Sequence, residues 1–437
     1  MTDLAIPLPS LTEADPVVAG EGSLDPLGLA LVADRLAEHL LPGLRARMRR
    51  VRFLTLAAAG ALATDELGDA PPADGMSTPS ICFEWLVLEA FARRGGKGAP
   101  LEASGVPGST KVRSVLAQGK RLAYRNYLKS PSVFGFTGVY LPLARHLRVL
   151  DDERHPAANI AALTNAWEKD NGLTGFTNAS LHTEGGRLRE RIRTEVRAAL
   201  SAGQCTTEPG AHLWSQLAEC MHPLRPGPSE RRLLAAWLTS SEEPVRAQLA
   251  SFLAGQPLLS EAELVDSVFA NHPSDEVRVR LTAMVAYEGV ARLLDAAFHQ
   301  LRYRSMHLGS VALSPAEAAR DEIIAKVAQA IPAAMLRASD RLAFLDSGLL
   351  TLFTDRLGRF AVRMTPAEFV ESIMAQHESV QAAKPPKGKR PWFDRYGAGW
   401  VVRSPYWTEG AADLEGRWFV HPYRMASLQA FMKDLSP

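Results

Sequence analysis

The chain has 437 residues and a formal net charge of +1, with 46% hydrophobic and 22% charged residues. These fractions exclude an intrinsically disordered chain, and the length predicts about two to three domains. The three cysteines exclude a disulfide framework, and no uncharged apolar run reaches the roughly 18 to 20 residues that span a bilayer. We therefore expect a cytoplasmic protein that does not associate with membranes.

The first 25 residues are acidic and contain prolines, without the basic and apolar regions of a secretory signal. We expect them to form a flexible lead-in. The first helix should begin after Asp25-Pro26, which combines a capping residue with a proline suited to the first turn, and end at Pro42-Gly43.

An arginine-rich stretch opens the next predicted helix, with arginines at positions 45, 47, 49, 50 and 52. It has two interpretations that the sequence leaves open. The arginines could form a phosphate-contacting edge, or they could be a solvated helix end that pairs with nearby acids.

The segment from Arg93 to Arg148 carries most of the unusual charge. It contains eleven lysines and arginines and one acid, Glu102, so its charge is +10 and the rest of the chain sums to −9. A concentrated basic field of this kind is typical of proteins that bind a phosphate-bearing partner.

Two helices are predicted in this segment, over residues 111–129 and 136–150, separated by Ser130-Pro131. With Asn171-Gly172 as the tip of a possible wing hairpin, they suggest a helix-turn-helix or winged-helix-like unit. The glycine-rich run 105–111 is not a Walker loop, because its lysine follows the Ser-Thr pair instead of preceding it. The interleaved aromatics are expected to fill the core rather than stack on bases: Tyr124, Tyr127, Phe134, Phe136 and Tyr140.

The rest of the chain should be an irregular helical bundle, because helical patterns continue to residue 383 without a fixed repeat. Capping boxes are predicted at Ser314 and Thr365. Residues 384–391 form a basic, proline-rich connector, followed by an aromatic antiparallel hairpin and a closing helix from Met425 to Leu435. The predicted fold is mainly α, with domains over 26–180, 181–383 and 384–437.

Catalytic signatures are missing, so we predict no catalytic residues, no cofactor and no metal, and favour a protein without enzymatic activity. His421 is expected to be structural. A cluster of Cys205, His212, Cys220 and His222 lacks the paired spacing of a zinc site. Acids at positions 295, 340, 346 and 355 leave a cryptic metal-dependent nuclease open as an alternative.

Three stretches resemble uncharacterised bacterial proteins encoded in antiphage defence gene clusters. They are Pro42-Gly43 with Arg52-Phe53, Tyr287-Glu288 with Tyr303, and residues 389–393 with Val402-Arg403. The resemblance implies a setting of nucleic-acid processing beside other subunits such as a helicase or nuclease, and it transfers no active-site residue.

The leading hypothesis is a non-catalytic, DNA-binding component of such a defence assembly. A scaffold or adaptor that meets an acidic protein partner is the alternative. The predicted nucleic-acid contacts are Lys111, Arg113, Lys120, Arg121, Arg125, Lys129, Arg145, Arg148, Lys387, Lys389 and Arg390.

Overall fold

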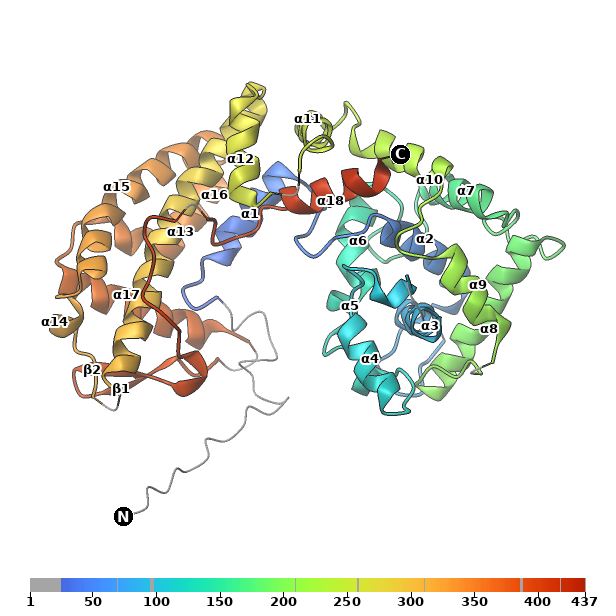
Figure 1. Cartoon of the computed structure of the whole chain (residues 1–437), viewed down its shortest axis with the longest axis horizontal. Coiled ribbons are helices and arrows are strands. Elements are labelled where there is room, and N and C mark those ends of the chain that lie inside the picture. Colours follow the sequence, from blue (N-terminus) through green and yellow to red (C-terminus); the bar gives the residue numbers. More distant parts are fainter. Residues whose placement is uncertain are drawn as a thin grey trace, which may run out of the picture. The chain divides into compact units, whose positions relative to one another are not determined.

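The computed structural model of the protein describes residues 25–68, 70–94, 98–208, 210–257, 259–309, 311–385, 388–416 and 418–436. These residues are mainly helical and include one two-stranded antiparallel sheet near the C-terminus (Figure 1). The predicted mainly α fold with a C-terminal hairpin is therefore confirmed. Across the described part of the chain, each helix is too short or too polar to cross a bilayer. The expected lead-in lies outside the described residues except for Asp25.

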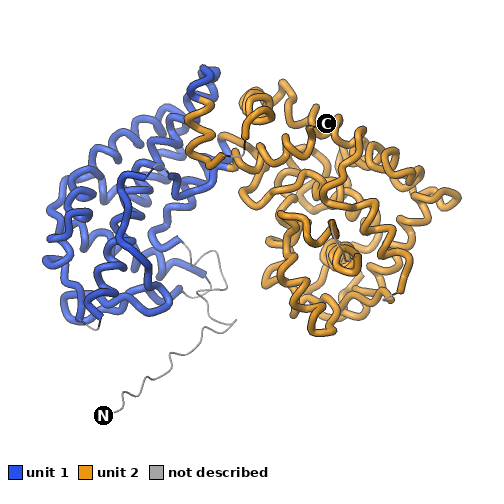
Figure 2. The backbone as a smooth tube through the Cα atoms, in the orientation of Figure 1, with its two compact units in different colours: residues 1–39, 269–423 blue, residues 40–268, 424–437 orange. Residues whose placement is uncertain are grey.

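The chain divides into two compact units, each built from two separate stretches (Figure 2). Unit 1 comprises Met1–His39 and Phe269–Tyr423, and unit 2 comprises Leu40–Val268 and Arg424–Pro437. These boundaries do not coincide with the division expected at residues 180 and 383, because a closing segment returns to the core of unit 2 and the first helix joins unit 1.

Unit 1 is organised around two long helices, α13 (Asp275–His307) and α15 (Glu322–Leu345), which pack along each other. The capping box predicted at Thr365 is complete, with Glu368 as its partner, whereas at Ser314 the structure shows one half of the predicted box, the hydrogen bond from Glu317 N to the Ser314 side chain. The remaining elements of this unit are α1 (Ala30–Leu40), α14 (Pro315–Ala318), α16 (Ser347–Leu357), α17 (Pro366–Ala383), β1 (Phe393–Tyr396) and β2 (Gly399–Val402).

The hairpin of unit 1 pairs Phe393 with Val402, and its turn is made by Gly397 at a φ of 58°. The buried imidazole of His377 on α17 holds both ends of this unit together. Its Nδ1 lies 2.9 Å from the carbonyl oxygen of Pro26, and its Nε2 accepts a hydrogen bond of 2.8 Å from Trp392 N.

Unit 2 is built around α2 (Arg52–Thr64) and α3 (Pro79–Arg93), which are buried along most of their length. Small residues let these helices approach closely, because a Cβ on Gly60 would lie 2.4 Å from the ring of Phe83. The surrounding helices are α4 (Ser109–Ala117), α5 (Pro131–Phe134), α6 (Phe136–His146), α7 (Ile160–Asn171), α8 (Glu184–Ala202), α9 (His212–Cys220), α10 (Pro228–Leu238), α11 (Pro244–Leu253), α12 (Glu261–Ala270) and α18 (Met425–Leu435).

The arginine-rich stretch before α2 is partly internal. Arg52 is fully buried, where it pairs with Glu230 of α10 and donates to the carbonyl oxygen of Cys220. Arg50 pairs with Asp434 of α18 at 2.6 Å. Both arginines pair with acids, as the second interpretation expected, but Arg52 lies in the core and not at a solvated helix end.

The predicted helix-turn-helix region differs from expectation. The helix expected over residues 111–129 ends at Ala117, since Gly119 takes a φ of 69° that breaks the helix. The expected wing is also wrong. Asn171 ends α7 and Gly172 caps it in the left-handed conformation, and among the described residues the sole sheet is the hairpin of unit 1.

The interleaved aromatics largely follow the core interpretation, because Tyr127, Phe136 and Tyr140 are buried. The hydroxyl of Tyr140 accepts hydrogen bonds from the backbone N–H groups of Arg49 and Arg50. These rings therefore connect the basic segment to the core of unit 2.

Candidate nucleic-acid interface

The predicted cationic contacts in unit 2 fall into two classes, those already paired with acids and those that are not. Arg113 pairs with the exposed carboxylate of Glu102 at 3.1 Å, and Arg145 with that of Asp152 at 3.4 Å. Exposed pairs of this kind contribute little to stability, so these arginines can exchange their partners readily. Lys111 is half-buried and also interacts within the chain.

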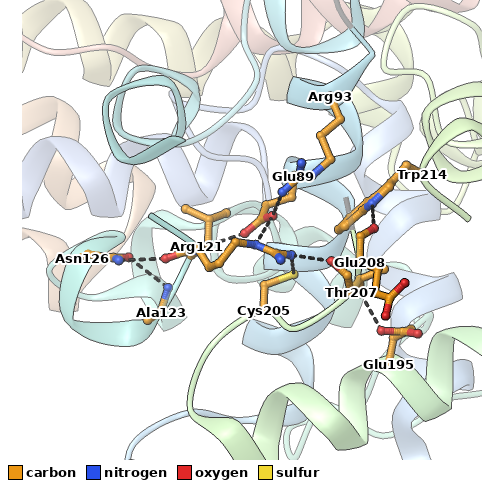
Figure 3. A network of polar contacts seen from close by, with 11 residues as sticks. Glu89, Arg93, Arg121, Ala123, Asn126, Glu195, Cys205, Thr207, Glu208 and Trp214 are labelled. Atoms are coloured by element: carbon orange, nitrogen blue, oxygen red, sulfur yellow. Dashed lines mark hydrogen bonds and ion pairs between the residues drawn. The ribbon is translucent and has the colours of Figure 1, made fainter. Parts of the chain in front are cut away.

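Arg121 is the member of the set that points into the protein (Figure 3). Its Nε lies 2.9 Å from Glu89 Oε2 on α3, and its Nη2 donates to the carbonyl oxygen of Thr207 at 2.8 Å. Glu89 is fully buried and also accepts a hydrogen bond of 3.0 Å from Arg93. We therefore treat Arg121 as a positioning residue, because its charge is committed to a buried carboxylate.

The same network fixes the backbone on either side of Arg121. Glu89 Oε1 accepts a hydrogen bond of 2.8 Å from Leu122 N, and the carbonyl oxygen of Leu122 accepts one of 2.8 Å from Cys205 N. The Asn126 amide closes a tight turn, since its Oδ1 accepts from Ala123 N and its Nδ2 donates to the carbonyl oxygen of Arg121 (Figure 3). The backbone around Arg121 is thus held by hydrogen bonds to the core of unit 2.

We call residues 118–130 the cationic loop. It presents three exposed cations, Lys120, Arg125 and Lys129. Lys120 donates to Gln118 at 2.9 Å, and none of the three forms an ion pair within the described part of the chain. Arg125 also lines a cavity of about 240 Å³ at the edge of the loop, together with Tyr124 and Gly203. This arrangement places exposed positive side chains on a backbone that is held by hydrogen bonds to the core.

The remaining predicted contacts are dispersed. Arg148 is exposed and has a φ of 52°. In unit 1, Arg390 pairs with Asp394 at 2.7 Å, Lys389 is half-buried, and Lys387 lies outside the described residues. Among the predicted contacts in the described part of the chain, Lys120, Arg125 and Lys129 share one loop and are exposed.

Cys205, Cys220 and His421, which were considered for metal binding or acid–base chemistry, are buried or paired within the fold, whereas His212, Asp340 and Asp355 are exposed. The cysteine thiols are free and buried, and burial raises the pKa of Cys205 and of Cys220 to about 12. His421 Nδ1 lies 2.8 Å from the buried Glu288, which also accepts a hydrogen bond of 2.7 Å from the Tyr423 hydroxyl. The described residues contain no group of three or more His, Cys, Asp or Glu side chains placed to hold a metal ion.

Two buried carboxylates on α3, Glu84 and Glu89, were not singled out from the sequence as organising groups. Burial raises the pKa of Glu84 to about 7, although hydrogen bonds from Tyr127 and Thr137 oppose this shift. The available signal was the spacing of two acids within the otherwise apolar run of residues 81–91. An acid surrounded by core residues must find a partner, and here both partners come from the basic segment.

Comparisons with known proteins found no relative of this chain. The chain matches no family model, no curated protein and no solved structure.

Proposed function

We propose that the chain is a non-catalytic nucleic-acid-binding protein that grips the phosphate backbone of DNA through Lys120, Arg125 and Lys129. One observation carries the proposal. Three exposed cations without acid partners in the described chain share a loop whose backbone is held by a buried arginine–carboxylate pair. A fixed loop loses little conformational freedom on binding, so the attraction to phosphate is not offset by a large ordering cost.

Backbone contacts suit this surface better than base readout. Specific readout normally places a helix or a β-ribbon in the major groove, and the helix expected at residues 111–129 ends before the cationic loop. Lysine and arginine side chains on a loop can instead neutralise phosphates whatever the sequence. We therefore expect binding that depends strongly on salt and weakly on sequence.

The proposed setting is an antiphage defence assembly, with other subunits such as a helicase or a nuclease as partners. It is supported by the resemblance of the three stretches that begin at Pro42, Tyr287 and Lys389. The test is co-purification of the native chain with the products of adjacent genes.

An acidic protein partner is the competing candidate, because arginines of the basic segment already bind carboxylates within the chain. Arg93, Arg113, Arg121 and Arg145 each pair with an acid. Purification with and without added nuclease separates the candidates. A complex bridged by nucleic acid should fall apart when nuclease is added, whereas a direct protein complex should persist.

The binding test measures fluorescence anisotropy of labelled 20-base-pair DNA at low salt. Lys120→Glu, Arg125→Glu and Lys129→Glu together should weaken binding on the order of 100-fold, because three phosphate contacts are reversed in sign. The matched control combines Lys169→Glu, Arg197→Glu and Arg232→Glu, three exposed cations of unit 2 outside the basic segment. The proposal fails if the native chain does not bind DNA at low salt, or if both triple variants lose affinity equally. Single-stranded RNA of the same length serves as the arm that distinguishes the nucleic acid.

A further inference from the structure

Unit 2 contains a second feature, independent of the cationic loop and of the function proposed for it. A partly open cavity of about 320 Å³ lies against α2 and α3 and is also lined by residues between Ser132 and His155. Pockets for small molecules begin at about 300 Å³ and are mostly apolar with a few convergent polar groups. The cavity therefore has the size and the composition of a small ligand site.

One wall of the cavity is apolar and shaped by small residues. Ala57, Gly60 and Ala61 of α2 form it, with Phe83 of α3 and Leu141 of α6 beside them. Gly60 is held against the Phe83 ring, where no Cβ would fit, so this part of the wall is closely packed. Such a surface favours a compact apolar group.

Arg154 supplies the charge that this wall lacks. It lines the cavity in a half-buried position, where burial lowers the pKa of its guanidinium. Its one hydrogen bond within the described chain joins Nη2 to the carbonyl oxygen of Ser132 at 3.3 Å. Nη2 carries a second hydrogen, which together with the hydrogen of Nε or of Nη1 can bind a carboxylate through two parallel hydrogen bonds.

The backbone at Arg154 is strained, since its φ of 74° is one that glycine adopts readily and arginine does not. Strain of this kind clusters at ligand sites, where a particular side chain must be held in place. A glycine here would relax the backbone but remove the guanidinium.

The polar groups at the N-terminus of α3 also favour an anion at this position. The N-terminus of α3 reaches the cavity through Thr78 and Ser80, whose hydroxyl oxygens are 2.9 Å apart. Helix N-termini attract negative charge. Asp65 and Glu153 also line the cavity, but both are exposed, and solvent and salt screen their charges more than that of the half-buried guanidinium.

We propose that this cavity binds a small organic molecule that carries a carboxylate on an apolar body. The carboxylate pairs with the Arg154 guanidinium, and the apolar body lies on Ala57, Ala61 and Leu141. Either group alone is insufficient, because the cation is partly screened and the apolar wall is small.

The test is isothermal titration calorimetry of the full chain with three probes. 3-Phenylpropionate carries both groups, 3-phenylpropanamide lacks the charge, and acetate lacks the apolar body. The carboxylate should bind at least tenfold more tightly than the amide, and acetate should give no measurable heat. No binding of 3-phenylpropionate at millimolar concentrations, or equal binding of the amide, overturns the proposal.

Variants assign any binding to this cavity. Arg154→Gly should abolish the preference for the carboxylate while keeping or raising the thermal stability, because glycine relieves the positive φ. Arg148→Gly is the matched control, an arginine that also has a positive φ but does not line this cavity, and it should bind like the native chain. Ala61→Leu should block binding by filling the cavity. Native-like binding by Arg154→Gly, or equal losses in both glycine variants, contradicts the assignment.

Discussion

Among its described residues, unit 2 contains three buried carboxylates, Glu84, Glu89 and Glu230, which differ in the charge of their partners. Glu89 and Glu230 are paired with arginines, so their negative charges are compensated. Glu84 receives hydrogen bonds from neutral groups instead, the Tyr127 hydroxyl at 2.6 Å and the amide and hydroxyl of Thr137. Burial without a charged partner should make the protonation of Glu84 change near neutral pH.

Glu84 should contribute to the pH dependence of stability. Burial raises its pKa to about 7 in the folded chain, from an ordinary value of 4.5. Between these values the folded state holds the proton more tightly than the unfolded state does. Stability should therefore fall as the pH rises from about 4.5 to 7, by up to about 3 kcal/mol.

Urea unfolding at pH 5 and pH 8 measures this effect in the native chain and in Glu84→Gln. The glutamine stays neutral, so the variant should lose less free energy of unfolding between the two pH values than the native chain. An identical pH dependence in both proteins would show that Glu84 remains ionised in the fold.

At the scale of elements, the cationic loop depends on its buried anchor. Arg121→Met should leave Glu89 with one fewer cation in the core and destabilise the protein by roughly 3 kcal/mol. Hydrogen exchange of the amides at residues 122–127 should speed up at the same time. Arg113→Met is the control, since its pair with Glu102 is exposed, and it should change stability by less than about 1 kcal/mol. Equal effects of the two variants would show that the pair with Glu89 does not hold the loop.

The sequence predicted elements whose signals are local. The caps at Ser314 and Thr365 and the C-terminal hairpin needed only neighbouring residues. The helix over residues 111–129 failed for a local reason as well, because its periodic apolar positions continued past Gly119 although the glycine takes a positive φ.

The sequence predicted the concentration of positive charge at the candidate site, but it did not predict which of these side chains point into the protein. Arg121 looked like a surface cation because its partner Glu89 lies 32 residues away, and Arg52 finds Glu230 at a separation of 178 residues. No spacing rule connects such pairs. The cavity beside Arg154 was not foreseen for the same reason, since its walls come from α2, α3, α6 and a later loop.

At the scale of the whole molecule, each unit is completed by a distant stretch of chain. In unit 2, α18 brings Phe431 within 6.2 Å of the Tyr140 ring, and it supplies Asp434 to Arg50. A fragment of residues 40–268 should therefore unfold at lower urea concentration than the same fragment joined through a flexible linker to residues 424–437. Equal midpoints in urea titrations would show that α18 does not contribute to the core.

The central claim concerns the loop that presents Lys120, Arg125 and Lys129, and the salt dependence of DNA binding tests it most directly. Each phosphate contact contributes about −0.9 to the slope of log affinity against log salt concentration. The native chain should therefore show a slope about 2 to 3 steeper than the triple variant in these residues, whereas the control triple variant should keep the native slope. A native slope near zero, or the same slope in both triple variants, would contradict the account.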